Sequence, residues 1–127
     1  MLNRILLMGR LTRDPELRRT AAGKAVASFA LAVERDIPYK ESGARGVDFL
    51  DVTAWGKTGE FVANHFSKGR MALVEGRLQM EEWTDRNGVR RRSPRVVADR
   101  VWFGDAPRRP EGQPRADGPD EGVRLPF

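Results

Sequence analysis

The 127-residue sequence has no cysteine, only one histidine and no long hydrophobic run. The absence of cysteine excludes disulfides, thiol nucleophiles and cysteine-ligated zinc sites, and it favours an intracellular location. The apolar run near the start, residues 5–8, is far too short for a signal sequence or a membrane-spanning helix. These absences predict a soluble protein of the cytoplasm.

Groups that perform catalysis are equally scarce. The single histidine, His65, falls at the apolar spacing of an expected helix, which favours a structural role. No cluster has the spacing of metal ligands, no Gly-x-x-x-x-Gly-Lys phosphate loop is present, and no nucleophile is paired with a base. Asp48 and Asp51 are candidates for a shared site, although carboxylates on a strand are more often surface groups. The sequence therefore predicts no enzyme, no cofactor and no metal ion.

What the chain does have is positive charge, concentrated in one part. The formal net charge is +5, which favours a polyanionic partner, either nucleic acid or an anionic membrane surface. Residues 1–104 hold 19 of the 23 basic residues and nearly all the apolar ones. Residues 105–127 hold five of the eight prolines and too few apolar side chains to form a core. We expect one folded domain, residues 1–104, and a disordered tail, residues 105–127.

Apolar periodicity in the body predicts five strands and one helix, residues 57–69, between the third and fourth strands. The strands are expected at residues 2–11, 25–34, 47–55, 71–83 and 95–103. The first is apolar on both faces, as expected of a strand that is covered on two sides or that forms a subunit contact. Residues 12–24 are expected as a polar connection, and Asn87-Gly88 as a hairpin turn. This order predicts an all-β fold, a five-stranded OB-fold barrel, with a split α+β sandwich as the alternative.

Two of these strands place aromatic rings on polar faces. Phe49 and Trp55 share one parity with Asp51 and Thr53, and Trp83 shares the parity of four charged or amide side chains on its own strand. Unpaired bases stack on exposed rings while arginine and lysine hold the phosphates, without strong dependence on sequence. The alternative is that a neighbouring loop or subunit covers the rings. The pattern favours a protein that binds single-stranded nucleic acid.

Other residues are candidates for the same site. Tyr39, in the loop of residues 35–46, is a possible further stacking platform, whereas Trp102 is expected in the core or an interface. Arg18 and Arg19 are expected as ordinary surface residues. The arginines expected to contact phosphate are Arg4, Arg10, Arg77, Arg90, Arg91 and Arg92.

Three segments of the body form a pattern: "MLNRILLMGRLTRDPELRRTAAGKAVASFALAVER", then "DFLDVTAWGKTGEFVANHFSKG", then "VEGRLQMEEWTDRNG". In order and spacing these segments resemble bacterial single-stranded DNA-binding proteins. The resemblance implies an OB-fold that assembles as a homotetramer, with DNA wrapped around the outside. It also implies work in DNA replication, recombination and repair, in the bacterial cytoplasm with the nucleoid, without a membrane partner.

The resemblance also assigns residues. Phe49, Trp55 and Trp83 fall where the family has its base-stacking aromatics. The chain departs from the family at Glu81 and Glu82, where basic residues are frequent, and in the loop of residues 35–46, where a family tryptophan has no match in kind.

The end of the chain resembles the family's interaction tip. Leu125, Pro126 and Phe127 match a terminal motif that docks onto replication and repair proteins, although Arg124 interrupts a thinned acidic stretch. The alternatives are an RNA-binding OB domain, a replication-restart adaptor of the primosomal protein N type, and a structural protein whose rings contact only other subunits. An OB-fold nuclease is the enzymatic alternative.

Overall fold

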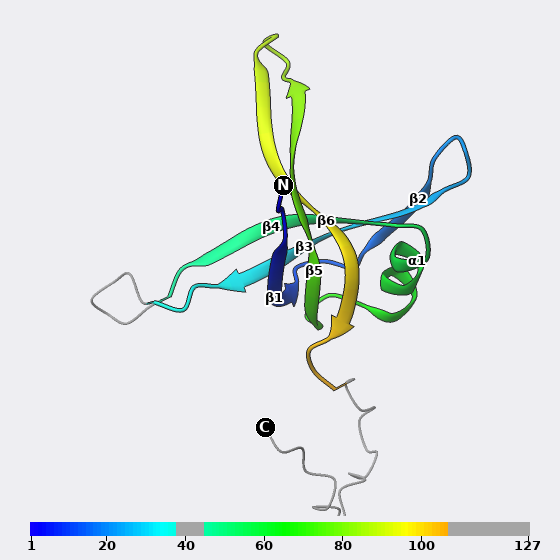
Figure 1. Ribbon diagram of the computed structural model, residues 1–127, viewed down its shortest axis with the longest axis vertical. Helices are drawn as coiled ribbons and strands as arrows, with labels where there is room; N and C mark the ends of the chain where they lie inside the picture. The colour runs from blue at the N-terminus through cyan, green and yellow to red at the C-terminus, as the bar shows by residue number, and fades with distance from the viewer. Residues whose placement is uncertain (38–44, 107–127) are drawn as a thin grey trace, which may run out of the picture.

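The computed structural model describes residues 1–37 and 45–106, which form six strands and one helix (Figure 1). The helix α1 spans Gly56–His65 and lies between β4 and β5. The strands are β1 Ile5–Leu11, β2 Glu16–Arg19, β3 Ala25–Glu34, β4 Val47–Trp55, β5 Met71–Thr84 and β6 Arg90–Phe103.

Five of these strands close into a ring. β1 pairs with β5, β5 with β6, β4 with β3, and β3 returns to β1 at Arg10 and Leu11, all antiparallel. The pairing of β4 with β6 is parallel, and it joins the two halves of the barrel. The helix lies between the third and fourth barrel strands. The predicted five-stranded OB-fold barrel is therefore confirmed.

The short strand β2 is an element that the sequence did not predict. It adds to the outside of β3 as an antiparallel hairpin, with Leu17 opposite Ala27, within the expected polar connection. All four β2 residues are exposed, so no apolar alternation marks the strand. Its turn has Gly23 at φ +85° and a hydrogen bond from the Thr20 amide to the Lys24 carbonyl.

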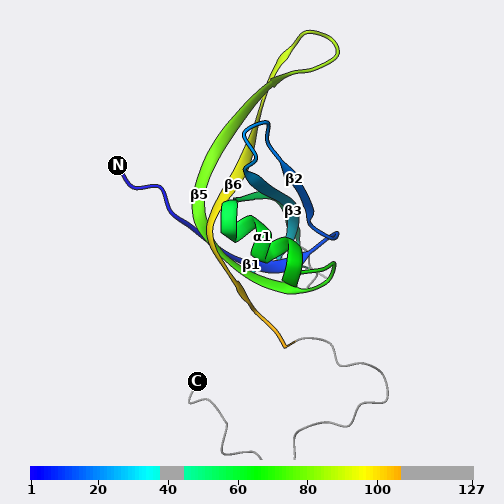
Figure 2. The same cartoon turned by 90° about the vertical axis from the view of Figure 1, so that its right-hand side faces the viewer.

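The core fills the barrel and the space beneath α1, which lies across the end of the barrel away from the β5–β6 hairpin (Figures 1 and 2). Gly59 lets the helix approach β4 closely, because a Cβ there would be 2.4 Å from the Ala54 carbonyl oxygen. The helix ends at His65, four residues before the end expected from the sequence at residue 69. The largest fully buried side chains are Phe29, Leu11, Leu31, Val52, Val62, Val74 and Val96.

β5 and β6 continue beyond the barrel as a long hairpin, residues 77–95, which we call the arm (Figure 1). By alternation Leu78 and Met80 fall on the same parity of β5 as Ala72 and Val74, which favours the core, but they are exposed because the strand leaves the barrel there. At the tip, Asp85 accepts hydrogen bonds from the amides of Asn87 and Val89, both at 2.9 Å. These bonds and the Arg91 guanidinium lower the pKa of Asp85.

Candidate nucleic-acid interface

The three rings singled out by the sequence are exposed. Phe49 is 71 % exposed, Trp55 45 % and Trp83 49 %, so no described part of the chain covers them. The β3 side chains beside these rings are small, since Ala32 lies opposite Phe49 and Ala30 lies opposite Asp51. The rings therefore project above their neighbours on β3. Stacking of bases on these rings remains a prediction, but its first requirement, accessible ring surface, is met.

Trp55 borders a hollow of about 180 Å³ between β2, β3, β4 and the arm. The strand register brings its lining together, because Arg18 lies opposite Val26 and Val26 lies opposite Trp55. On the other side of the hollow, the arm contributes Gln79 and Arg95, which lie opposite each other. The lining residues are Arg18, Val26, Thr53, Trp55, Gln79, Glu81, Arg95 and Val97.

Arg95 is held in this hollow by two hydrogen bonds. Its Nη1 donates to Oγ1 of Thr53 at 2.9 Å, and its Nε donates to Oε2 of Glu81 at 2.9 Å. Thr53 lies on the polar parity of its strand, which favours solvent exposure, but it is buried. A guanidinium is therefore fixed in the same hollow as an indole ring.

The other tryptophan of this surface, Trp83, is held by its neighbours on the arm. Its Nε1–H donates to Oγ of Ser93 at 3.2 Å, and it lies opposite Arg91. Residues directly opposite across an antiparallel pair share a face, so Arg91 lies on the Trp83 side. Arg90 and Arg92, one residue away on either side, point to the other side of the arm.

We call the surface formed by Phe49, Trp55, Trp83, Arg18 and Arg95 the ring face. Sequence reasoning assigned Arg18 to ordinary surface, because the strand that brings it to Trp55 carries no apolar signal. Arg95 belongs to the same run of arginines around the hairpin as Arg90, Arg91 and Arg92, a run that favours phosphate contact. Neither its neighbours in the hollow nor its partner Thr53 is visible from spacing.

Most of the predicted phosphate-binding arginines already have carboxylate partners. Arg4 pairs with Asp99 at 2.8 Å and with Glu75 at 3.1 Å, and hydrogen bonds to both carboxylates raise its pKa. Arg10 and Arg4 lie outside the lining of the hollow beside Trp55. The remaining pairs are Arg10–Asp105 at 3.4 Å, Arg77–Asp99 at 3.8 Å, Arg91–Asp85 at 2.9 Å and Arg92–Glu82 at 3.3 Å. Among the described residues, Arg90 forms no ion pair.

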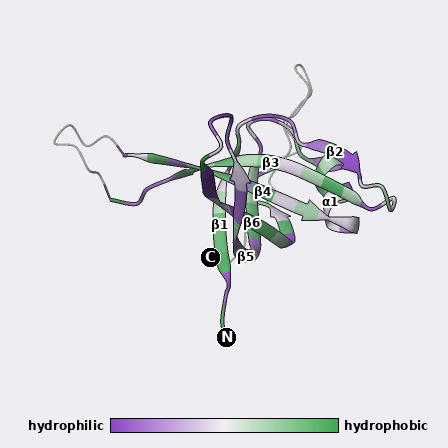
Figure 3. Cartoon of the chain, turned by 90° about the horizontal axis from the view of Figure 1, so that it is seen from above, coloured by the Kyte–Doolittle hydropathy of each residue, from purple (hydrophilic) through white to green (hydrophobic). Residues whose placement is uncertain are grey.

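A second exposed surface is apolar. The register places Met8 opposite Leu73 and Leu73 opposite Trp102, so one row crosses β1, β5 and β6. Leu6 lies on the same side of β1, two residues before Met8. We call Leu6, Met8, Leu73 and Trp102 the apolar face. The hydropathy colouring contrasts the hydrophobic β1 with the hydrophilic β2 (Figure 3).

Trp102 was predicted to lie in the core or an interface. It is 46 % exposed, so the core placement is wrong, and the interface placement remains a prediction.

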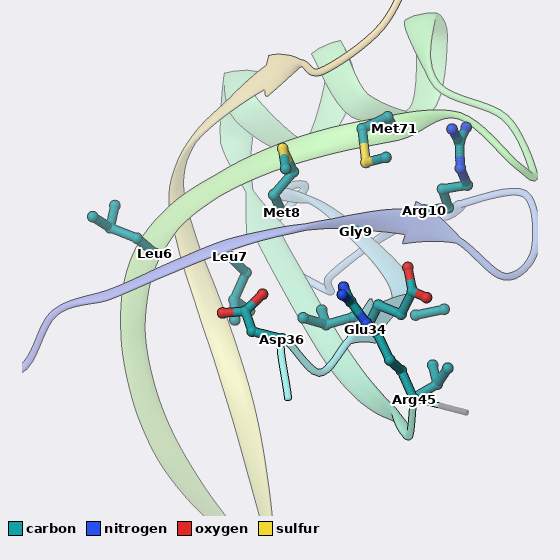
Figure 4. Close-up of a pocket in the computed structure, with 12 residues that line it drawn as sticks. Leu6, Leu7, Met8, Gly9, Arg10, Glu34, Asp36, Arg45 and Met71 are labelled. Atoms are coloured by element: carbon teal, nitrogen blue, oxygen red, sulfur yellow. The ribbon is translucent and has the colours of Figure 1, made fainter. Parts of the chain in front are cut away.

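Another hollow, of about 520 Å³, runs along β1 beside the start of the β3–β4 hairpin. Glu34, Asp36 and Arg45 gather on one side of β1, and Met8 and Met71 lie on the other (Figure 4). No member of the ring face lines it.

Four of the predicted site residues, Tyr39, Leu125, Pro126 and Phe127, lie outside the described residues. Within residues 1–37 and 45–106, no group of three or more acidic or histidine side chains is arranged so that it could bind a metal ion. In the same ranges, no helix has the length and apolar character needed to cross a membrane.

Comparison with known proteins supplies the family. The model of the single-strand binding protein family matches residues 2–103. The chain belongs to this family. Its predicted resemblance is thereby confirmed, and the OB-fold described above is the fold of the family.

Curated members of the single-strand binding protein family cover most of the chain. Single-stranded DNA-binding protein 2 of Listeria monocytogenes is 48 % identical over 103 residues, which are 81 % of this chain and 64 % of that protein. Single-stranded DNA-binding protein A of Bacillus subtilis is 47 % identical over 81 % of this chain and 59 % of its own length. The Thermotoga maritima single-stranded DNA-binding protein is 43 % identical, covering 81 % and 74 %. The matched region thus spans less than two thirds of the first two relatives, and all three are named for binding rather than for an enzymatic reaction.

Proposed function

We propose that this chain binds single-stranded DNA with little dependence on sequence. The observation that supports this most directly is the ring face, where three exposed aromatic rings lie on a surface that also carries guanidinium groups. Stacking of a base on an aromatic side chain is worth about 1–3 kcal/mol, and every base has a face to stack. The names of the curated relatives agree with this ligand.

In this proposal the arginines divide into two groups. Arg18 and Arg95 contact the phosphates of a nucleotide stacked on Trp55, because they line the same hollow. Arg90, Arg91 and Arg92 contact phosphates farther along the strand, as the sequence predicted. The surface ion pairs that these residues form are worth only about 0–1 kcal/mol, so phosphate can replace the carboxylates.

Tryptophan fluorescence tests the function, because two of the three tryptophans belong to the ring face. Oligo(dT) should quench the fluorescence, duplex DNA of equal length should quench it much less, and added salt should restore it. Quenching by duplex and single strand alike would contradict the proposal. An RNA oligonucleotide of matched length distinguishes the alternative of an RNA-binding domain.

We further propose that the protein works as a homo-oligomer, a tetramer by family resemblance, and that the apolar face is where copies meet. Residues 5–9 of β1 pair only with β5 among the described residues, which leaves one strand edge open to a second copy. The apolar face begins on that same strand. A second copy that pairs with this open edge would also cover the exposed apolar side chains beside it.

The protein's place in DNA replication, recombination and repair, in the cytoplasm with the nucleoid, follows from family membership and is part of the proposal. Leu125, Pro126 and Phe127 serve as its tip for recruiting replication and repair proteins. Removing Pro126 and Phe127 should leave oligo(dT) binding unchanged and abolish capture of such partners. Undiminished capture by the truncated chain would show that the tip has no such role.

A further inference from the structure

The hollow beside Trp55 contains a carboxylate as well as two guanidinium groups. Glu81, Arg18 and Arg95 all line it, and the Oε2 atom of Glu81 accepts the hydrogen bond from Nε of Arg95 at 2.9 Å. Glu81 is thus bound to a guanidinium that shares a hollow with the ring on which the proposed function stacks a base. Glu81 occupies the Nε–H of Arg95, so a phosphate cannot use that donor while the carboxylate holds it, and two anions at one guanidinium repel each other.

The three charged residues differ in how firmly they are held. Arg95 has a second anchor, the Thr53 hydroxyl at 2.9 Å, so it keeps its position without Glu81. The Glu81 side chain is 51 % exposed against 31 % for Arg95, and its carboxylate makes no other ion pair among the described residues. Arg18 has no ion-pair partner in the described part of the chain. Glu81 is therefore the member that can move into solvent while both arginines remain.

We propose that Glu81 is an internal competitor of the DNA phosphate. This inference rests on the proposed function. In the free protein Glu81 holds Arg95. When a base stacks on Trp55, its phosphate displaces the carboxylate from Arg95, and Arg18 in the same hollow contacts the phosphate as well. The exchange lowers the affinity below what the ring and the two arginines would give with an uncharged side chain at this position.

The exchange also has a signature in the salt dependence. A phosphate that meets a free arginine releases condensed counterions, which gives a slope in log affinity against log salt of about 0.7 per contact for single strands. A phosphate that meets Arg95 releases the same DNA counterions, but it must first displace Glu81, and salt weakens the exposed Arg95–Glu81 ion pair. Salt therefore eases the exchange while it weakens the phosphate contact, so the wild-type slope should be shallower than the slope of a variant without this carboxylate.

The test is Glu81→Gln in the full chain, titrated with oligo(dT) across a series of salt concentrations. Glutamine keeps the length of the side chain and an oxygen for Arg95 while it removes the charge. Affinity should rise by about 2- to 5-fold at low salt, the size expected for one partly exposed ion pair. The slope should steepen by less than the roughly 0.7 of a whole phosphate contact, because only the screening of the Arg95–Glu81 pair is lost.

Two further variants separate this effect from a change of net charge. Glu60→Gln removes the same charge from another arginine–glutamate pair, Arg19–Glu60 at 3.2 Å, which does not line the hollow. It should leave affinity and slope at the wild-type values. In an Arg95→Gln background, Glu81→Gln should give no gain in affinity, because the guanidinium for which Glu81 and the phosphate compete is absent.

Three outcomes would overturn the inference. They are an unchanged affinity in Glu81→Gln, an equal gain in Glu60→Gln, and a gain that persists without Arg95. Failure of the wild type to bind oligo(dT) would instead contradict the proposed function itself.

Discussion

Both the ring face and the apolar face expose tryptophan, and they differ in what surrounds it. Trp55 is bordered by Arg18, Arg95 and hydrogen-bonding side chains. Trp102 continues a row with Leu73 and Met8 on a sheet with an open edge. The fractions exposed are nearly equal, 45 % and 46 %, so exposure does not distinguish the two surfaces.

The neighbours of a ring therefore indicate its partner better than its exposure does. A base offers a flat apolar surface with a charged phosphate close by, and a ring beside a fixed guanidinium matches both parts. A ring among aliphatic side chains offers only apolar area, which another protein surface covers best. On this basis we assign DNA to the ring face and a second copy to the apolar face, and the following changes test that division.

The largest effect is expected from a charge in the middle of the apolar face. Leu73→Glu should reduce the mass of the assembled protein, because burying an unpaired carboxylate from each copy costs several kcal/mol. Light scattering measures the mass. Gln79→Glu adds the same charge on the ring-face side, where it lines the hollow, and should weaken oligo(dT) binding at unchanged mass. Equal masses for wild type and Leu73→Glu would show that the copies do not meet at the apolar face.

The second effect concerns the rings. Trp55→Ala and Trp83→Ala should each weaken oligo(dT) binding by about 1–3 kcal/mol, because each removes one stacking surface. Trp102→Ala, a matched removal of an exposed indole, should leave the affinity of the assembled protein unchanged. Binding is followed by anisotropy of a labelled oligonucleotide, since the substitutions remove the intrinsic probe.

Thermal unfolding of the same three variants checks that each one folds. If Trp102→Ala weakens binding as much as Trp55→Ala does in folded protein, the two faces do not have separate partners.

The barrel was predictable because its strands carry apolar side chains with regular alternation. β3 and β4 match the predicted residues 25–34 and 47–55 at both ends, and the helix lies where the change of period places it. The prediction was wrong for segments whose side chains do not pack against the core, because such segments have no apolar pattern that marks their structure. β2 is polar throughout apart from Leu17, and the arm has no core to face, so its alternation resembles that of a buried strand until Leu78 and Met80 prove exposed.

The rings of the site were predictable for the opposite reason. Phe49, Trp55 and Trp83 interrupt a pattern, and a large apolar side chain on a polar parity is visible in one dimension. Arg18 and Arg95 interrupt nothing, since an exposed arginine is ordinary anywhere. Their significance depends on which strands lie side by side, and the unpredicted strand β2 is the one that brings Arg18 to Trp55.

The smallest expected effect concerns the arginines of the arm. Replacing Arg90, Arg91 and Arg92 with alanine should flatten the plot of log affinity against log salt by about 0.7 for each arginine–phosphate interaction removed. Among the described residues Arg90 has no carboxylate partner, whereas Arg91 and Arg92 exchange Asp85 and Glu82 for phosphate. Arg91 and Arg92 should contribute less to affinity than Arg90, because each must first give up an exposed carboxylate partner.

Arg100 provides the matched control for this slope. It is an exposed arginine two residues before Trp102, lies opposite Glu75 beside the apolar face, and forms no ion pair in the described part of the chain. Arg100→Ala should leave the slope unchanged if DNA keeps to the ring face and the arm. An equal flattening by Arg100→Ala would mean that the strand also crosses the apolar face, and an unchanged slope in the arm variant would mean that its arginines face only solvent.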